Sequence, residues 1–247
     1  MNKKNVVLAA TSCATLIAHA GDLSSPTIFY DLHYTSYREP GVMTVNSKLP
    51  AITVGYRNFT TLLEQKGFGS GLSYNLEATI GHTEYSGSGT HANNFYKFIG
   101  EVYTPITSKL YVGLGYRHLL DDFGPGLTST NYATYDRISQ YFYIPIGSIL
   151  KAENESRMNV QFNYFVGGRQ TSYLTQVGGY YNDAANKQNS GYGLDFSVTT
   201  PKADWEFYLR YWNIGRSNLV QISTSTGARS AYEPNNNTVE IGVRRSF

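Results

Sequence analysis

Ionisable side chains in this chain recur at alternate positions of segments whose intervening residues are apolar. In Asp31-Leu-His33 an acid and an imidazole are separated by one leucine. In an extended segment, residues two apart share a face, so such side chains line one surface and can pair as ions, line an aqueous path or exchange protons. Sorting by parity places seven basic residues, six acids and one histidine on this face: Asp31, His33, Arg57, Glu77, Lys97, Glu101, Arg117, Arg137, Arg169, Asp195, Glu206, Arg210, Glu240 and Arg244.

Proton-transfer chemistry has little support among these residues. Asp31 and His33 form the one Asp-x-His spacing, and we expect them to belong to a network of charges rather than to a catalytic site. Asp121 and Asp122 follow His118, but adjacent strand residues point to opposite faces. We therefore predict that the chain is not an enzyme.

Metal and cofactor motifs are also missing from the sequence. The histidines His82, His91 and His118 are isolated, and Asp121 to Gly126 lacks the periodic oxygen ligands of a calcium loop. The glycines from Gly67 to Gly71 precede a strand rather than a helix, so they indicate a turn and not a phosphate cradle. We predict no metal and no cofactor.

Period-two alternation predicts the elements that hold the charged face. In Thr27 to Tyr37, Ile28, Tyr30 and Leu32 alternate with polar residues, and the pattern recurs about ten times. The expected strands are residues 27–37, 49–59, 71–85, 95–104, 109–120, 136–146, 157–172, 192–200, 205–214 and 238–247. Pro145 makes the sixth of them the least regular, because proline cannot donate to a ladder.

The connections between these strands alternate in length. Residues 104–109 and 199–204 form short turns, and 149–156 and 60–70 fall on the same side. The segments 38–48, 86–94, 121–135, 175–190 and 216–237 are generally longer and rich in Ser, Thr, Gly and Asn. This asymmetry predicts a single all-β domain over residues 21–247, an antiparallel up-and-down β-barrel that spans a membrane with about ten strands, or eight or twelve. A soluble β-sandwich is the alternative, but it has no need of aromatic residues on its solvent face.

The first twenty residues predict a secretory signal peptide. Lys3 and Lys4 precede an apolar stretch from Val6 to Ile17, and Ala18-His-Ala20 is a small-x-small cleavage site. A buried N-terminal helix and a lipoprotein acylated at Cys13 are the alternatives. Cys13 is the only cysteine, so a processed chain has no disulfide or thiolate metal site. Without Lys3 and Lys4, 18 basic residues face 18 acidic ones, which gives no reason to expect nucleic-acid binding.

Aromatic residues gather near the ends of the expected strands. Rings with a polar group favour the boundary between acyl chains and headgroups, so the pattern indicates two interfacial girdles. The residues are Tyr37, Tyr56, Phe59, Tyr85, Tyr116, Tyr192, Trp205 and Tyr211.

The signal peptide, the alternating strands and the terminal Phe247 resemble the class of Gram-negative outer-membrane β-barrel proteins, without a motif that selects a subfamily. The resemblance implies export to the outer membrane, contact with outer-membrane lipid and lipopolysaccharide, and assembly by the barrel-assembly machinery, which reads a C-terminal strand ending in an aromatic residue. Ten strands is also the size class of the omptin proteases and some neisserial adhesins, but size alone does not carry function across.

The charged lumen admits two functions. If the facing basic and acidic rows leave a path, the barrel is a porin-like channel for passive diffusion of small hydrophilic solutes, which is the function we expect. If the charges fill the interior, the barrel is a non-conducting surface or adhesin-type protein that binds partners through its extracellular loops. Interior glycines such as Gly55, Gly113 and Gly115 favour an opening, because they save volume; the alternative is that they serve to curve the strands.

Overall fold

The computed structural model describes residues 26–59, 62, 71–107, 109–154, 156–200 and 205–247. The predicted signal peptide lies outside the described residues. Among these residues no helix is long and apolar enough to cross a bilayer.

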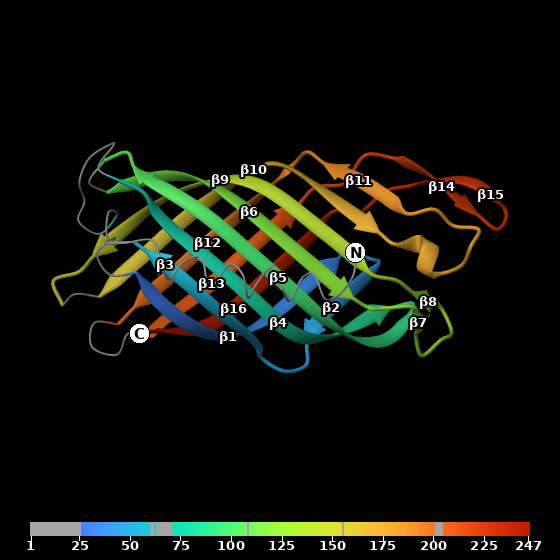
Figure 1. The fold of residues 1–247 in the computed structure, drawn as a ribbon, viewed down its shortest axis with the longest axis horizontal. Helices are drawn as coiled ribbons and strands as arrows, with labels where there is room; N and C mark the ends of the chain where they lie inside the picture. The colour runs from blue at the N-terminus through green and yellow to red at the C-terminus, as the bar shows by residue number, and fades with distance from the viewer. Residues whose placement is uncertain (1–25, 60–61, 63–70, 108, 155, 201–204) are drawn as a thin grey trace.

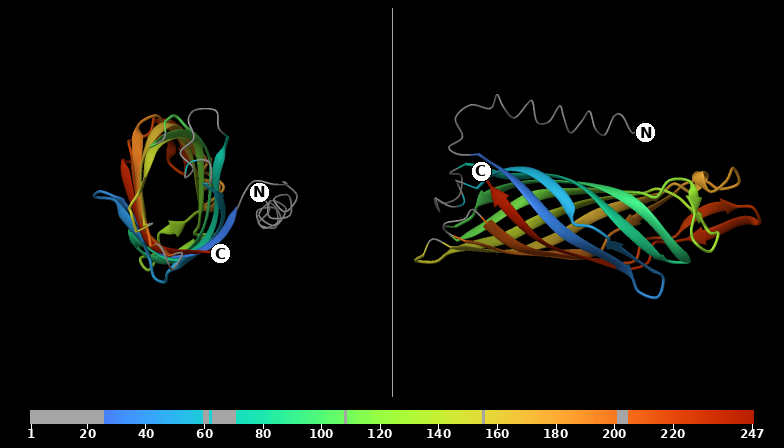
Figure 2. Two further views of the ribbon diagram at one scale, coloured as in Figure 1. Left: turned by 90° about the vertical axis from the view of Figure 1, so that its left-hand side faces the viewer. Right: turned by 90° about the horizontal axis from the view of Figure 1, so that it is seen from below.

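Ten antiparallel strands close into a barrel, as predicted (Figures 1 and 2). The sheet closes because β1 pairs with β16 and β9 pairs with β10, so every barrel strand has two neighbours. The barrel strands are β1 (Thr27–Glu39), β2 (Met43–Ser47) continued by β3 (Ala51–Asn58), β4 (Ser73–Gly87), β5 (Gly89–Pro105), β6 (Leu110–Asp122), β9 (Arg137–Lys151), β10 (Arg157–Ser172), β12 (Gly191–Thr199), β13 (Trp205–Ile214) and β16 (Asn236–Ser246).

Short elements extend the end of the barrel opposite the C-terminus (Figure 1). They are β7 (Gly126–Leu127), β8 (Ala133–Thr134), the 3-10 turn η1 (Leu174–Gln176), β11 (Ala184–Gln188), β14 (Val220–Thr224) and β15 (Gly227–Ala231). β11 continues the line of β12 along the edge of β10, and β14 and β15 form a separate hairpin. We call this end the loop end and the opposite end the terminal end.

Two segments differ from the sequence expectation. The predicted loop 86–94 is mostly strand, because β4 and β5 continue to a tight turn in which Gly89 has φ +93°, a conformation that glycine adopts without strain. β9 runs through Pro145, at a place where pairing with β6 breaks off between Val112↔Ile146 and Gly115↔Tyr143. The proline therefore removes no bond from that ladder.

The outer wall is apolar. On β1 the side chains of Ile28, Tyr30, Leu32 and Tyr34 are each about half exposed, while Asp31 and His33 between them are buried. Period two thus sends the apolar row outward and the ionisable row inward, which is the reverse of a soluble protein.

Inside the barrel, two aromatic clusters accompany the charged residues. The first consists of Tyr141, Tyr143, Phe165, Trp212 and Ile214, and the second of Leu62, Tyr103 and Tyr111, with Phe59 and Ile149 against it. Side chains therefore fill much of the ring that the ribbon outlines in Figure 2.

Candidate functional site

Thirteen of the fourteen ionisable residues selected by parity lie inside the barrel, where each is buried or nearly so. The exception is Arg169, which is exposed on the outer wall. The register of β10 against β9 shifts between Phe165 and Gly167, so a β-bulge reverses the parity of every later residue in the strand. The expectation that Arg169 faces inward is therefore wrong.

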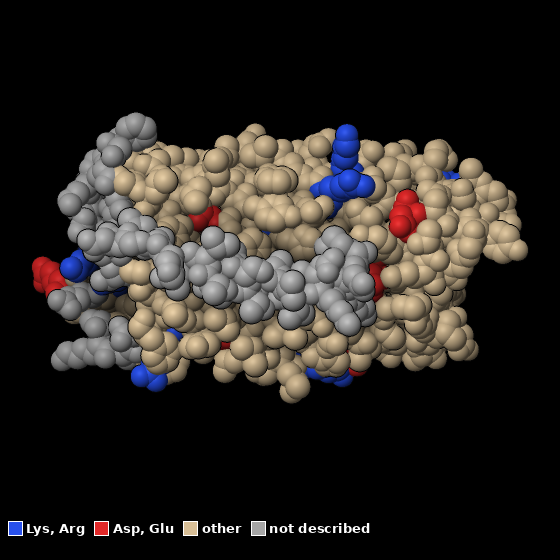
Figure 3. All heavy atoms as spheres, viewed as in Figure 1, with Lys and Arg blue, Asp and Glu red and all other residues tan. Residues whose placement is uncertain are grey.

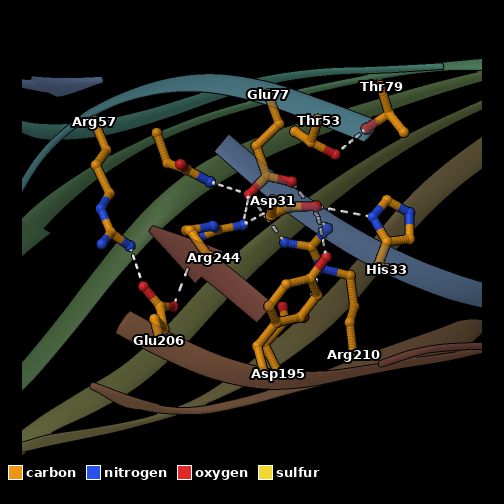
Figure 4. A network of polar contacts seen from close by, with 12 residues as sticks. Asp31, His33, Thr53, Arg57, Glu77, Thr79, Asp195, Glu206, Arg210 and Arg244 are labelled. Atoms are coloured by element: carbon orange, nitrogen blue, oxygen red, sulfur yellow. Dashed lines mark hydrogen bonds and ion pairs between the residues drawn. The ribbon is translucent and has the colours of Figure 1, made fainter. Parts of the chain in front are cut away.

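Two arginines hold three acids at the centre of the lumen (Figure 4). The guanidinium of Arg210 lies 3.1 Å from Glu77 and 2.8 Å from Asp195. That of Arg244 lies 2.9 Å from Glu77 and 3.2 Å from Asp31. Glu77 thus bridges two arginines from neighbouring strands on the far wall, so the network ties opposite sides of the barrel together.

Glu240 is the common anion of three cations. Its carboxylate lies 2.6 Å from the Lys97 ammonium, 3.4 Å from Arg210 and 3.6 Å from Arg117. The Glu240 and Lys97 side chains are 1% and 2% exposed, so water does not screen this pair. Through Arg210 this group joins the network around Glu77.

The network continues toward the terminal end through Arg57. Its guanidinium forms an ion pair with Glu206 and donates to the hydroxyl of Ser246 at 2.8 Å. Glu206 also lies 3.6 Å from Arg244. Arg57 comes from β3 and Glu206 from β13, which β1 and β16 separate in the sheet.

Glu101 is held by neutral groups alone. No lysine or arginine of the described chain forms an ion pair with it, but Tyr103 donates to its carboxylate at 2.6 Å and Tyr143 at 2.9 Å. Asn75 and Gln161 add two donors at 2.9 and 3.2 Å. Four donors compensate a buried carboxylate, so Glu101 links its own strand β5 to β4, β9 and β10 without a cation.

Asp31 and His33 have the geometry of an acid–imidazole pair but no approach for a substrate. Their carboxylate and Nδ1 lie 2.9 Å apart, and Asp31 also accepts from the Tyr208 hydroxyl at 3.1 Å and pairs with Arg244. Nε2 of His33 has no hydrogen-bond partner. Both side chains are at most 1% exposed, so they belong to the lumen network and have no open face.

A smaller cluster lies at the loop end around Arg137. Its guanidinium lies 3.1 Å from Glu39 and 3.2 Å from Asp121, and it faces the ring of Tyr37. Tyr37 donates to Glu39 at 2.6 Å. This cluster ties β1, β6 and β9 together at the loop end.

Sequence reasoning missed Glu233, which lies in the segment between β15 and β16. Its carboxylate accepts from the Ser172 hydroxyl at 3.1 Å. Burial raises the pKa of the Glu233 carboxyl, and the charge of Arg137 opposes that shift only in part. Because the residue is outside any alternating strand, no period-two signal could have indicated it.

The interior glycines accommodate rings instead of opening a path. A Cβ on Gly55 would come within 1.9 Å of the Phe29 ring, and one on Gly115 within 2.2 Å of the Tyr143 ring. Both rings are buried. Two cavities lie along the lumen, with volumes of about 20 and 40 Å³.

Part of the set predicted to form the aromatic girdles faces outward. Tyr192 and Trp205 are exposed on the outer wall, where Tyr192 lies 6.0 Å from Tyr211 between ring centres. Three others belong to the inward face, because strand parity decides the direction of a side chain and proximity to a strand end does not. These are Tyr37, Phe59 and Tyr85.

Phe247, the predicted assembly signal, stays on the outside. Its side chain is 68% exposed, and its backbone N–H donates to Ile28 at 2.9 Å, which extends the β1–β16 pairing to the last residue. Its ring packs edge-on against Tyr30 with 5.8 Å between centres.

No protein-family model and no curated protein matches this chain. Several solved structures have a similar backbone. The outer-membrane protease OmpT of Escherichia coli is 11% identical, with 90% of this chain and 96% of that chain covered and a TM-score of 0.42. The β domain of the Bordetella autotransporter BrkA is 11% identical, with 91% and 100% covered and a TM-score of 0.45. The translocator domain of NalP from Neisseria meningitidis is 10% identical, with 99% and 96% covered and a TM-score of 0.42. Similarities at this level assign no function.

Proposed function

We propose that this ten-stranded barrel of the outer-membrane class is a sealed surface protein that acts through its loop end. The observation that carries the proposal is the filled lumen, in which charges from both walls pair with one another. Glu77 forms ion pairs with both Arg210 and Arg244. Glu240 forms ion pairs with both Lys97 and Arg210.

The cavities support a sealed interior. A cavity needs roughly 10–15 Å³ to hold one water molecule, so volumes of about 20 and 40 Å³ accommodate one to a few waters and no hydrophilic solute. The smaller cavity is lined by Lys97, Arg117 and Glu240, and the larger by Glu101, Arg210 and others. Ion pairs separate the two.

The outer wall supports placement in a membrane. Exposed apolar patches beyond a few hundred Å² are rare on soluble monomers, yet large apolar side chains cover this wall on every barrel strand. We infer that hydrocarbon covers them, that the loop end faces outside the cell, and that the predicted signal peptide exports the chain to the outer membrane.

The loop end offers the groups for recognition. Tyr180, Tyr132 and Leu219 are 74%, 62% and 59% exposed there, among small polar residues. Rigid aromatic rings beside adaptable hydroxyls and amides suit binding to a protein or glycan surface. The hairpin of β14 and β15 projects beyond the barrel wall and is mostly exposed (Figure 1).

Porin-like diffusion, the function expected from the sequence, is the second candidate. One observation favours it: residues of a single ion-pair network line both cavities. Lys97 and Glu240 line one cavity, and Arg210, which contacts Glu240 at 3.4 Å, lines the other. Separation of these pairs would join the two cavities, which is one of the rearrangements that a gated channel would need.

Conductance distinguishes the two. Residues 21–247 are refolded in detergent, shown to float with liposomes, and added to a planar bilayer. The sealed barrel inserts without unitary current steps. Stable steps that change with Arg117→Glu would replace the proposal with the porin-like channel.

A second experiment tests action at the loop end. Arg229 lies on the exposed hairpin strand β15. Trypsin added to intact cells should cleave after Arg229 and leave the barrel assembled, whereas cleavage only after the cells are broken would place the loop end inside and overturn the proposal.

A further inference from the structure

Two cations face each other on the outer wall near the loop end. Arg169 of β10 and Lys187 of β11 are directly paired across the strands, and both are exposed. Like charges directly opposite one another destabilise a sheet. No carboxylate of the described chain forms an ion pair with either residue, so an anion from outside the chain would relieve their repulsion.

The β-bulge is what creates this pair. Before the bulge, odd-numbered residues of β10 such as Gln161 and Asn163 face the lumen, and after it Gln170 does. Without the extra residue, Arg169 would point inward. The bulge therefore moves one positive charge from the lumen to the outer wall.

The height of the pair corresponds to the outer headgroup layer. Arg169 is 12 residues above the start of β10 at the terminal end. At about 3.3 Å per residue and a tilt of roughly 40°, it lies about 30 Å above that start, beyond an apolar band about 25 Å tall. The outward residues beneath it are Val160, Phe162, Tyr164 and Val166, which are 42–56% exposed and uncharged.

Tyrosines mark the boundary below the cations. Tyr164 pairs with Tyr192 across β10 and β12, and Tyr192 lies 6.3 Å from Phe162 and 6.0 Å from Tyr211 between ring centres. Tyrosines favour the depth between acyl chains and headgroups. The cations lie above these tyrosines. From the middle of the wall toward the loop end, the outward residues are thus apolar, then tyrosine, then basic. A lipid presents its acyl chains, the boundary to its headgroup and its phosphate in the same order.

Polar groups continue the row on the other side of Arg169. Gln140 of β9 is its register partner, and His118 of β6 is the partner of Gln140. Gln140 donates to the Tyr116 hydroxyl at 3.0 Å, so its amide is held at the surface. The row gives a phosphate additional hydrogen-bonding groups beside the two charges.

The backbone at Lys187 is held in place. Its N–H donates to the Asn218 side chain at 2.6 Å, and its carbonyl accepts from the Asn218 N–H at 3.0 Å. The cations thus stand on a rigid part of the sheet. Figure 3 shows basic side-chain atoms standing out from the wall over β10 and β11, at the upper right.

We propose that Arg169 and Lys187 bind the phosphate of an outer-leaflet lipid of the lipopolysaccharide type. The proposal rests on the membrane placement given under the proposed function and is independent of whether the lumen conducts. Arginine can bind two phosphate oxygens at once, and lysine adds a second charge.

The test is lipid binding by the refolded chain in nonionic detergent, with native mass spectrometry as the readout. Diphosphorylated lipid A should bind, while the same lipid without phosphates and inorganic phosphate alone should bind far more weakly. Each basic residue near a lipid surface contributes about fivefold in affinity, so Arg169→Gln and Lys187→Gln should each lose about fivefold and the double variant about 30-fold. Arg169→Lys should retain most of the affinity.

The same strand supplies a matched control. Arg157 and Lys151 are an exposed cross-strand pair at the terminal end of β10 and β9. Arg157→Gln with Lys151→Gln removes the same charge from the other end and should leave binding unchanged. If both double variants lost the same affinity for lipid A, the binding would depend on the overall charge of the protein and not on these two residues, and the proposal would be overturned. Equal binding of the dephosphorylated lipid, or of free phosphate, would also overturn it. Current steps in the bilayer experiment would end the sealed-lumen proposal and leave this result standing.

Discussion

Replacing Glu240 by glutamine should destabilise the barrel strongly. The carboxylate is the one anion within ion-pair distance of Lys97 and of Arg117 in the described chain, whereas Arg210 keeps Glu77 and Asp195. Glu240→Gln therefore leaves two buried cations without a counter-charge. Removing one partner of a buried ion pair costs about 3–5 kcal/mol, and we expect a loss of this size in the free energy of unfolding.

The assay is urea unfolding of the refolded chain in lipid vesicles, followed by the fluorescence of its two tryptophans. Glu84→Gln is the matched control. Glu84 pairs with Lys48 at 2.8 Å, but the two side chains are 37% and 53% exposed, so the loss should be roughly 0–1 kcal/mol.

A second variant separates charge from packing. Adding Lys97→Met to Glu240→Gln removes one orphaned cation and should recover part of the lost stability, since an apolar group of similar length needs no counter-ion. Unfolding of Glu240→Gln and Glu84→Gln at the same urea concentration, or a further loss of stability on adding Lys97→Met, would refute a cost of orphaned buried cations.

Three further outcomes follow from the packing, the loop end and the outer wall. Gly55→Ala should cost about 1–3 kcal/mol in unfolding free energy, because its Cβ would come within 1.9 Å of a buried ring, whereas Gly179→Ala, with open space around it, should cost little. Burial raises the pKa of the Glu233 carboxyl, so the folded state favours its protonated form. The docked segment 232–235 should therefore be most stable at low pH and should loosen as the pH rises through that raised pKa, while Arg137 and Glu39 nearby keep their positions. Hydrogen exchange of that segment, compared with Glu233→Gln, checks this; equal pH dependence in both chains would contradict it. Val160→Arg should cost about 2–4 kcal/mol in vesicles because it places a charge in the apolar band, and a cost-free substitution would show that this wall does not face lipid.

Alternation in the sequence was sufficient to find the barrel and to place thirteen ionisable residues inside it. Both follow from one local rule, since period two assigns a side chain to a face. The rule failed at Arg169 because one extra residue in β10 shifts the phase. The adjacent glycines Gly167 and Gly168 were the available signal, since glycine within a strand often marks a bulge.

Contacts across the barrel could not be predicted in the same way. Arg57 and Glu206 are 149 positions apart and meet only because the sheet closes. Whether the lumen is open depends on ring volumes and on the side chain that fills the space above each glycine. A glycine at position 55 predicts room for a path, but the ring of Phe29 occupies that room.

A cysteine scan along β10 tests the sealed, membrane-embedded barrel most directly. Residues 21–247 contain no cysteine, so single cysteines can be placed at outward, inward and post-bulge positions of the strand. The positions are Val160, Phe162, Tyr164 and Val166 outward, Gln161, Asn163 and Phe165 inward, and Arg169 after the bulge. In vesicles, the outward set should react with a membrane-soluble maleimide and Arg169→Cys with a water-soluble one, while the inward set stays unreactive until urea is added. Reaction of the inward cysteines with the water-soluble reagent in folded protein, or equal reaction of all positions from water, would contradict the account.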